Sequence, residues 1–285
     1  MRANGSNPGS RKPQPTADSV AVQHGSGAPQ STPDPHAHDA AAARGLPSLV
    51  WRFGQDRRFA MIRDLVDLDG AHALDLGCGV GMYTERMAAD GATAIGLEIE
   101  WPRAVEARER GLDVVAAVGE RLPVGDESLD VVLLHEVLEH VADDRETIKE
   151  AMRALRPGGR VLIFVPNRWW PFETHGIQWR GRYHFGNKPF VNYLPDVLRN
   201  RLAPHVRVYT GHGLRALFDG LPGHVVHHTR IYPGFDKLAT RRPRLAGALR
   251  RVFYGFERSP LRVFGLSHLL VVERDVHVGG ADPHA

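Results

Sequence analysis

Between residues 72 and 165, short apolar runs alternate with segments of helical spacing. Apolar runs rich in β-formers predict strands, and apolar positions three and four residues apart predict helices. The predicted strands cover residues 72–76, 93–97, 113–117, 129–134 and 160–165, and the predicted helices cover 82–89, 102–110 and 143–155. Strands that alternate with helices through short glycine-rich connections indicate a parallel sheet covered on both faces.

The regular alternation stops after Pro166. Residues 167–210 are rich in aromatic residues, glycine and proline, so we expect little regular structure there. A further helix is predicted at 213–219, and strands at 225–231 and 266–273 are expected to form an antiparallel pair at the sheet edge. Residues 241–251 form a basic stretch between these two strands.

The two ends of the chain differ in composition from the middle. Residues 1–45 are crowded with Gly, Pro, Ser and Ala without apolar periodicity, which predicts a disordered N-terminal tail. We expect one domain at 46–275, with a substrate or lid region at 167–210 and an inserted basic helical segment at 233–262. Residues 276–285 are expected to form a short C-terminal tail.

Composition narrows the possible compartment and partners. The 285 residues carry a formal net charge of +3 and a single cysteine, Cys78, which excludes an internal disulfide and favours a reducing compartment. No apolar run is long enough to span a membrane, and the N-terminus lacks the apolar core of a secretory signal. We expect a cytoplasmic protein, and a net charge this small gives little reason to expect nucleic-acid binding.

A glycine-rich turn at residues 75–81 carries the main chemical signal. Asp75-Leu76-Gly77-Cys78-Gly79-Val80-Gly81 follows a predicted strand and precedes a predicted helix. Glycines let a ligand approach the backbone closely. Glu98 ends the next strand about 20 residues later, where a carboxylate accepts hydrogen bonds from ribose hydroxyls. The pair predicts a ligand that contains adenosine.

This order of motifs resembles the class I S-adenosylmethionine-dependent methyltransferases. The resemblance rests on Asp75–Gly81, Glu98, Leu122-Pro123, the run from His135 to His140, and Leu155-Arg156-Pro157-Gly158-Gly159. Within that class, the chain is similar to the group that includes the ubiquinone-biosynthesis methyltransferases. The resemblance implies S-adenosyl-L-methionine as cofactor. It also implies a Rossmann-like, doubly wound, mainly parallel seven-stranded α/β sheet with helices on both faces and an antiparallel edge strand.

The resemblance also assigns roles to individual residues. The glycine turn would line the methionine and ribose parts of the cofactor, Glu98 would bind the ribose, and the remaining residues would lie near adenine or the sulfonium. The implied cofactor-binding residues are Asp75, Gly77, Cys78, Gly79, Gly81, Glu98, Ile99, Glu120, Arg121 and His135.

The fourth strand is followed by the candidates for acid–base chemistry. His135 is the expected catalytic residue, because a side chain at that strand end can face the acceptor. Glu136, Glu139 and His140 form an E-x-x-E-H pattern that some relatives use to hold a divalent cation. Non-metal relatives share the pattern, and we expect catalysis without a metal.

The acceptor site is expected in the aromatic segment after the fifth strand. Trp169, Trp170 and His175 are the candidate substrate-binding residues, although aromatic residues there also suit simple packing of the loop. The basic stretch at 241–251 is compatible with peripheral contact with an anionic membrane, or with a solvated arginine face over a packed one.

These observations predict an enzyme that transfers a methyl group to a small-molecule or lipid-like acceptor, at oxygen rather than at carbon or nitrogen. Three alternatives remain open. They are a nicotinamide-dependent dehydrogenase, a cofactor-binding module without catalysis, and a nucleic-acid methyltransferase that uses the arginine-rich stretch.

Overall fold

A seven-stranded sheet organises residues 52–276, the part of the chain that the computed structural model describes. Its strand order is β10-β11-β5-β4-β1-β2-β3, and β11 runs antiparallel to both of its neighbours. The strands are β1 (His72–Leu76), β2 (Thr93–Glu98), β3 (Val114–Ala116), β4 (Leu129–His135), β5 (Leu155–Pro166), β10 (Gly223–Ile231) and β11 (Ser267–Arg274). The predicted α/β fold class is confirmed, including the antiparallel pair at the edge.

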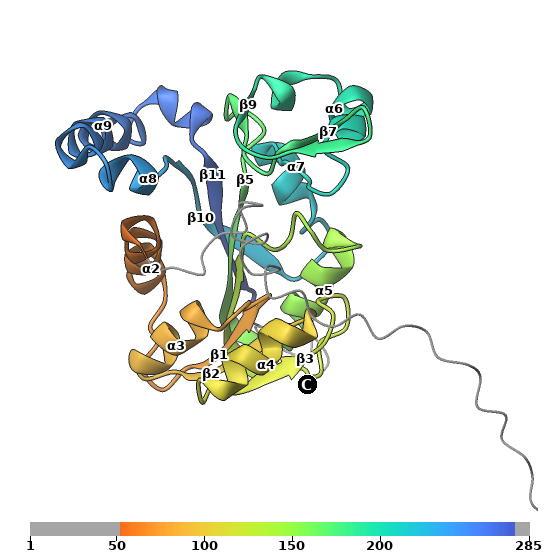
Figure 1. Ribbon diagram of the computed structural model, residues 1–285. Coiled ribbons are helices and arrows are strands. Elements are labelled where there is room, and N and C mark those ends of the chain that lie inside the picture. The colour runs from red at the N-terminus through yellow and green to blue at the C-terminus, as the bar shows by residue number, and fades with distance from the viewer. Residues whose placement is uncertain (1–51, 277–285) are drawn as a thin grey trace, which may run out of the picture. The chain divides into compact units, whose positions relative to one another are not determined.

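Alternate side chains of the central strands enter two different apolar cores. Leu74, Val132 and Ile163 point to one core, whereas Ala73, Val131 and Leu162 point to the other. The first core is covered by α5 (Asp144–Ala154) and α7 (Gly211–Ala216), and the second by α2 (Phe53–Leu65) and α3 (Met82–Ala89) (Figure 1). A short helix, α4 (Trp101–Glu109), packs small side chains against β3. The sheet is therefore covered on both faces, as predicted.

The α5 helix begins where the sequence predicts it. Asp143 is its N-cap, and the side-chain carboxylate accepts a hydrogen bond from the backbone N–H of Glu146 at 2.9 Å. The helix ends at Ala154, and the next residue already belongs to β5.

The segment after β5 is more regular than the sequence suggests. It contains β6 (Phe172–Glu173), β7 (Ile177–Trp179), β8 (Arg182–His184), β9 (Lys188–Pro189), a 3-10 helix η1 (Val191–Tyr193) and α6 (Asp196–Leu202). The expectation of little regular structure at 167–210 was wrong. The β7–β8 hairpin turns at Arg180 and Gly181, which both adopt positive φ, the conformation that a tight two-residue turn requires.

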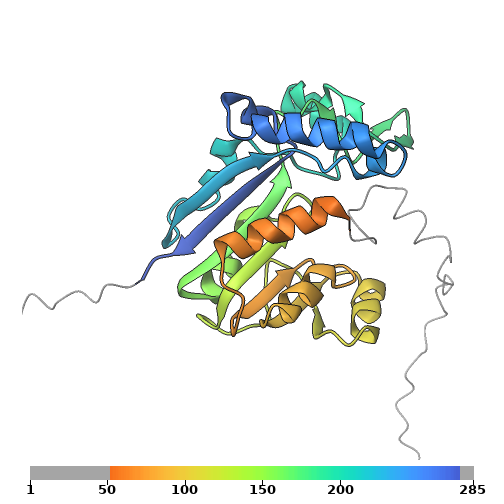
Figure 2. The same cartoon turned by 90° about the vertical axis from the view of Figure 1, so that its left-hand side faces the viewer.

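A second segment joins β10 to β11. It contains α8 (Asp236–Ala239), α9 (Pro243–Phe256) and a 3-10 helix η2 (Pro260–Phe264). Asn167 donates hydrogen bonds to the carbonyls of Val263 and Gly265, which ties this segment to the one that follows β5. Both segments lie beyond the same end of the sheet (Figures 1 and 2). We call residues 167–210 and 233–262 together the upper layer.

The remaining predicted elements are present with shifted ends, the largest shift being at β5, which begins at Leu155 and not at residue 160. The helix expected at 213–219 begins two residues earlier, where the Thr210 side chain caps it. Among the described residues, no helix combines the length and apolar character that a membrane span requires. The predicted N-terminal tail at 1–45 and all but the first residue of the predicted C-terminal tail at 276–285 lie outside the described residues.

The assignment of Asp143 as the N-cap of α5 can be tested by substitution. We expect Asp143→Ala to lower the free energy of unfolding by about 1 kcal/mol, because the Glu146 N–H loses its acceptor. Asp143→Asn keeps an acceptor oxygen and should lose much less. Urea unfolding of the two variants measures the difference, and equal stability of both with the wild type would contradict the capping role.

Candidate functional site

The glycine turn is hydrogen-bonded to the end of the neighbouring strand. The backbone N–H groups of Gly77 and Cys78 both donate to the Leu97 carbonyl, at 2.7 and 3.0 Å. All three glycines have positive φ. A Cβ on Gly77 would lie 2.4 Å from the Val137 side chain, and one on Gly81 would lie 2.2 Å from Leu112, whereas a Cβ on Gly79 would meet no atom within 4 Å. Gly77 and Gly81 are thus required for packing, and Gly79 leaves its surroundings open to a ligand.

Glu98 lies directly against this turn. One carboxylate oxygen accepts a hydrogen bond from the Gly79 N–H at 2.8 Å, and the other accepts from the Glu100 N–H at 2.8 Å. The residue is only 4% exposed. The fold therefore brings together the turn and the carboxylate that the sequence singles out. Cys78 lies between them, and burial together with the nearby carboxylates raises the pKa of its thiol.

Asp75 links the end of β1 to the start of α3. Its carboxylate accepts two hydrogen bonds from Thr84, one from the backbone N–H at 2.9 Å and one from the hydroxyl at 2.7 Å. The residue is buried, and this burial raises the pKa of Asp75 to about 6. In the structure, Asp75 fixes the start of α3 relative to β1.

The residues expected near adenine lie at the ends of β2 and β3. Ile99 is 68% exposed, and Val118 is also exposed, so apolar side chains are available on this side of the turn. The Glu120 carboxylate accepts hydrogen bonds from the N–H groups of Ala142 and Asp143 and so supports the start of α5. The Arg121 N–H donates to the Val118 carbonyl, and its side chain is exposed.

His135 ends β4 and belongs to a hydrogen-bonded cluster. Its Nε2 lies 2.9 Å from Arg58 Nη1 and 3.0 Å from the Tyr83 hydroxyl. Arginine only donates, so Nε2 accepts and the ring is neutral. Burial and the Arg58 guanidinium lower the pKa of His135 to about 3. In this arrangement the imidazole lone pair is occupied by Arg58.

Glu136 completes the same cluster. Its Oε1 accepts hydrogen bonds from Arg58 at 2.8 Å and from the Ser267 hydroxyl at 2.8 Å. Its backbone has a φ of 56°, a conformation that non-glycine residues rarely adopt. Such strain is common at functional sites, where surrounding contacts hold it. These contacts direct the Glu136 carboxylate towards Arg58.

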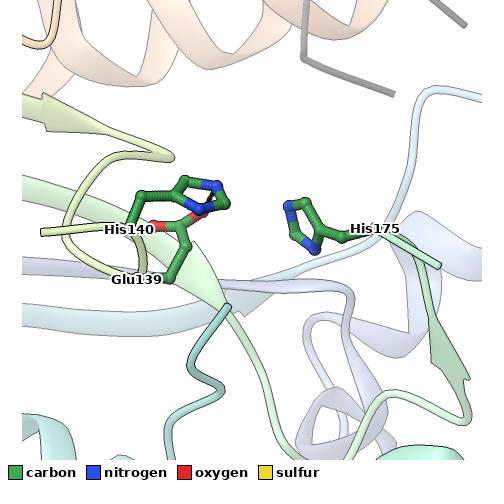
Figure 3. Close-up of side chains that lie close together, drawn as sticks. All are labelled: Glu139, His140 and His175. Atoms are coloured by element: carbon green, nitrogen blue, oxygen red, sulfur yellow. Dashed lines mark ion pairs between the residues drawn. The ribbon is translucent and has the colours of Figure 1, made fainter. Parts of the chain in front are cut away.

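Glu139 and His140, which follow Glu136 in the sequence, lie close to His175. One ligand atom from each of these three residues lies within 4.8 Å of the other two. The rings of His140 and His175 meet edge to face, with their centroids 5.3 Å apart, and the Glu139 carboxylate lies beside His140 (Figure 3). Glu139 is 1% exposed and neither of its oxygens has a hydrogen-bond partner. Burial and the neighbouring Glu136 raise the pKa of Glu139 well above its ordinary value.

A buried ion pair orients His175 for this cluster. Glu173 accepts hydrogen bonds from the His175 backbone N–H at 2.9 Å and ring Nδ1 at 3.2 Å, and from Arg199 at 2.8 Å. Both Glu173 and Arg199 are almost fully buried. Because Nδ1 donates to Glu173, Nε2 of His175 carries the free lone pair. On the other side, His140 Nδ1 lies 3.2 Å from the His205 carbonyl.

The two candidate tryptophans, Trp169 and Trp170, do not belong to the cluster of Glu139, His140 and His175. Trp169 is exposed and stacks near Tyr193, whereas Trp170 packs between Phe172 and Tyr232. Of the three residues expected to contact substrate, the structure brings only His175 next to the E-x-x-E-H turn.

Sequence reasoning missed Arg58, Tyr83 and the Glu173–Arg199 pair. Arg58 is one of many arginines and belongs to no motif, and its position over His135 follows from the packing of α2. Glu173 and Arg199 are 26 residues apart, so only the fold brings them together.

The raised pKa of Asp75 predicts a pH-dependent stability. The folded state favours the protonated acid, so ionisation costs stability progressively as the pH rises from about 4 to about 6. Relative to the wild type, Asp75→Asn should therefore gain up to about 3 kcal/mol between pH 4 and pH 7. Urea unfolding across this range measures the difference. The exposed Asp219→Asn serves as control, and a constant difference for Asp75→Asn would contradict the prediction.

Comparisons with known proteins relate part of this chain to methyltransferases. A methyltransferase-domain family matches residues 74–163. The ubiquinone biosynthesis O-methyltransferase of Pseudomonas entomophila is 39% identical over 121 residues, which cover 39% of this chain and 51% of that protein. The chain thus spans about half the length of the curated relatives it matches.

Two solved structures share the fold. An S-adenosylmethionine-dependent methyltransferase from Mesorhizobium loti aligns with a TM-score of 0.55 and 20% identity over 76% of this chain and 97% of that one. The putative methyltransferase bound to the Trm112 activator of Haloferax volcanii aligns with a TM-score of 0.57 and 20% identity over 85% of this chain and 96% of that one. Residues 74–163 thus match a methyltransferase-domain family, and the described chain has the fold of S-adenosylmethionine-dependent methyltransferases.

Proposed function

We propose that the chain transfers the methyl group of S-adenosylmethionine to a hydroxyl oxygen of a small or lipid-like acceptor. The binding of S-adenosylmethionine is supported by one observation. The Glu98 carboxylate accepts a hydrogen bond from the Gly79 N–H, and no atom lies within 4 Å of the place that a Cβ on Gly79 would take. The names of the curated relatives, which are O-methyltransferases of ubiquinone biosynthesis, support oxygen and a lipid-like acceptor.

The residues at the strand ends fit such a cofactor. Glu98 offers carboxylate oxygens to the ribose hydroxyls, and the exposed Ile99 and Val118 offer apolar surface to adenine. Arg58 offers a guanidinium suited to the amino-acid carboxylate at the end of β4. When bound, S-adenosylmethionine supplies a sulfonium-activated methyl group for in-line displacement by the acceptor, with S-adenosylhomocysteine as the other product.

His135 is the catalytic residue that the sequence predicts, but its neighbours favour a positioning role instead. With a pKa near 3 and its lone pair occupied by Arg58, the ring is poorly suited to accept a proton. We therefore propose that His135 positions Arg58 and Tyr83 around the methyl-transfer site. A separate group must then assist loss of the acceptor proton.

We further propose that Glu139, His140 and His175 hold a divalent cation that lowers the pKa of the acceptor hydroxyl. The expectation of metal-free catalysis remains untested. The buried Glu139 carboxylate without a hydrogen bond, facing two imidazoles, favours a cation. Two nitrogens and one carboxylate oxygen suit a transition metal or Zn²⁺. The Glu173–Arg199 pair would fix the orientation of His175, as carboxylates commonly do for metal-bound histidines.

Calorimetry tests the cofactor assignment. We expect purified protein to bind S-adenosylmethionine and S-adenosylhomocysteine, and Glu98→Ala to weaken binding at least about tenfold through loss of charged hydrogen bonds. Glu98→Gln should have a smaller effect, and the exposed Glu109→Ala should have none. Thermal unfolding of each variant verifies that the fold is intact. Wild-type affinity of a folded Glu98→Ala variant would refute the assignment.

Isotope labelling tests methyl transfer and the acceptor class. Cell extracts incubated with the enzyme and methyl-labelled S-adenosylmethionine should yield a labelled small or lipid-like molecule in mass spectrometry. Binding without any labelled product would favour a non-catalytic module, and label in RNA or DNA would favour a nucleic-acid methyltransferase.

The cation proposal predicts a stability change that is independent of activity. Zn²⁺ or Mn²⁺ should raise the melting temperature of the wild type by binding the folded state, and should not raise that of Glu139→Gln or His175→Ala. Without added metal, Glu139→Gln should be at least as stable as the wild type, because it removes a buried carboxylate without a hydrogen bond. Equal metal stabilisation of all three proteins would exclude this site.

A further inference from the structure

The upper layer has a large net positive charge, although the chain as a whole is nearly neutral. Residues 167–210 and 233–262 contain 15 arginines and lysines against four acidic residues, a formal charge of +11. The whole chain has a net charge of only +3, so the remaining residues are net negative. The four acids of the upper layer, Glu173, Asp196, Asp236 and Glu257, are all paired with arginine. The layer therefore presents excess positive charge.

The α9 helix divides into a packed face and an outer face. Ala246 is buried, the Arg250 guanidinium lies 3.8 Å from the centre of the Phe53 ring, and Tyr254 stacks in the same way on Arg57. These residues recur at intervals of four, as expected for one side of a helix. That side of α9 is fixed against α2.

The outer face of α9 combines apolar and basic side chains. Leu245 is 44% exposed and Val252 is 52% exposed, and their spacing of seven residues places them on one line along the helix. Arg244 and Arg251 have the same spacing and form an adjacent line. Among residues 52–276, no ion pair involves Arg241, Arg242, Arg244 or Arg251. The helix itself contains no acidic residue.

Exposed apolar residues continue across the layer beyond α9. Leu261 and Phe264 are exposed on and beside η2, and large side chains are also exposed in the segment after β5, namely Trp169, Trp179, Phe185, Phe190 and Val197. Figure 2 shows α9 crossing the upper layer in front of that segment. Exposed apolar side chains close to unpaired positive charge, as on the outer face of α9, are typical of interaction sites.

We propose that the upper layer, with the outer face of α9 at its centre, docks on an anionic phospholipid bilayer. Charge complementarity favours acidic headgroups, while Leu245 and Val252 supply the shallow apolar contact of an interfacial helix. With 14 residues, α9 is about 21 Å long and too short to cross a hydrocarbon core of about 30 Å, so it lies on the surface.

Vesicle sedimentation tests the proposal with the full-length protein. We expect binding to vesicles of phosphatidylcholine and phosphatidylglycerol at low NaCl, weaker binding at high NaCl, and little binding to pure phosphatidylcholine. Arg244→Ala/Arg251→Ala should partition roughly 25-fold more weakly, about fivefold for each arginine. Leu245→Ser/Val252→Ser should also bind more weakly, with the salt dependence preserved.

The matched control is Arg103→Ala/Arg108→Ala on α4, which should bind vesicles like the wild type. Calorimetry with S-adenosylhomocysteine should give the wild-type affinity for every variant, so failure of membrane docking is distinguishable from failure of the proposed activity. No sedimentation with anionic vesicles at low salt would overturn the proposal. So would wild-type binding by the Arg244→Ala/Arg251→Ala variant, or salt-dependent binding to RNA but not to vesicles.

Discussion

The contact between the end of β2 and the glycine turn determines the geometry of the whole site. Leu97 accepts two backbone hydrogen bonds from the turn, and the next residue, Glu98, accepts a third through its side chain. One strand end thus fixes both the path of the loop and the position of the carboxylate. Since Gly77 and Gly81 leave no room for a Cβ, the turn has little freedom to rearrange.

Buried charge is distributed unequally around the candidate cation site. Glu173 is neutralised by Arg199 and Glu136 by Arg58, so both carboxylates are held in the charged form. Glu139 is as buried as Glu173, but neither of its oxygens has a hydrogen bond, and its ion-pair contact is with His140 Nε2 at 3.9 Å. A charged group in such surroundings is costly unless something neutralises it. This contrast, more than the E-x-x-E-H pattern, supports a role for Glu139 beyond packing.

The central sheet could be predicted from sequence because each of its strands is a short apolar run with a clear local signal. Two other features could be predicted from local sequence. One is the N-cap at Asp143, which directly precedes a segment of helical spacing, and the other is the glycine turn followed by Glu98. The contacts of Arg58 with His135 and of Glu173 with Arg199 depend on packing between distant segments, and no local pattern encodes them. The short hairpin at Arg180 and Gly181 was missed because a single glycine among aromatic residues gives a weak turn signal.

The glycine turn and the upper layer are attached to different strands of the sheet. The glycine turn and Glu98 belong to β1 and β2, whereas the two segments of the upper layer begin after β5 and β10. Asn167 joins those segments to each other through backbone carbonyls, which any replacement residues would also supply. Under the function proposed above, a different upper layer grafted onto this sheet would change the acceptor side and leave Glu98 and the glycine turn in place.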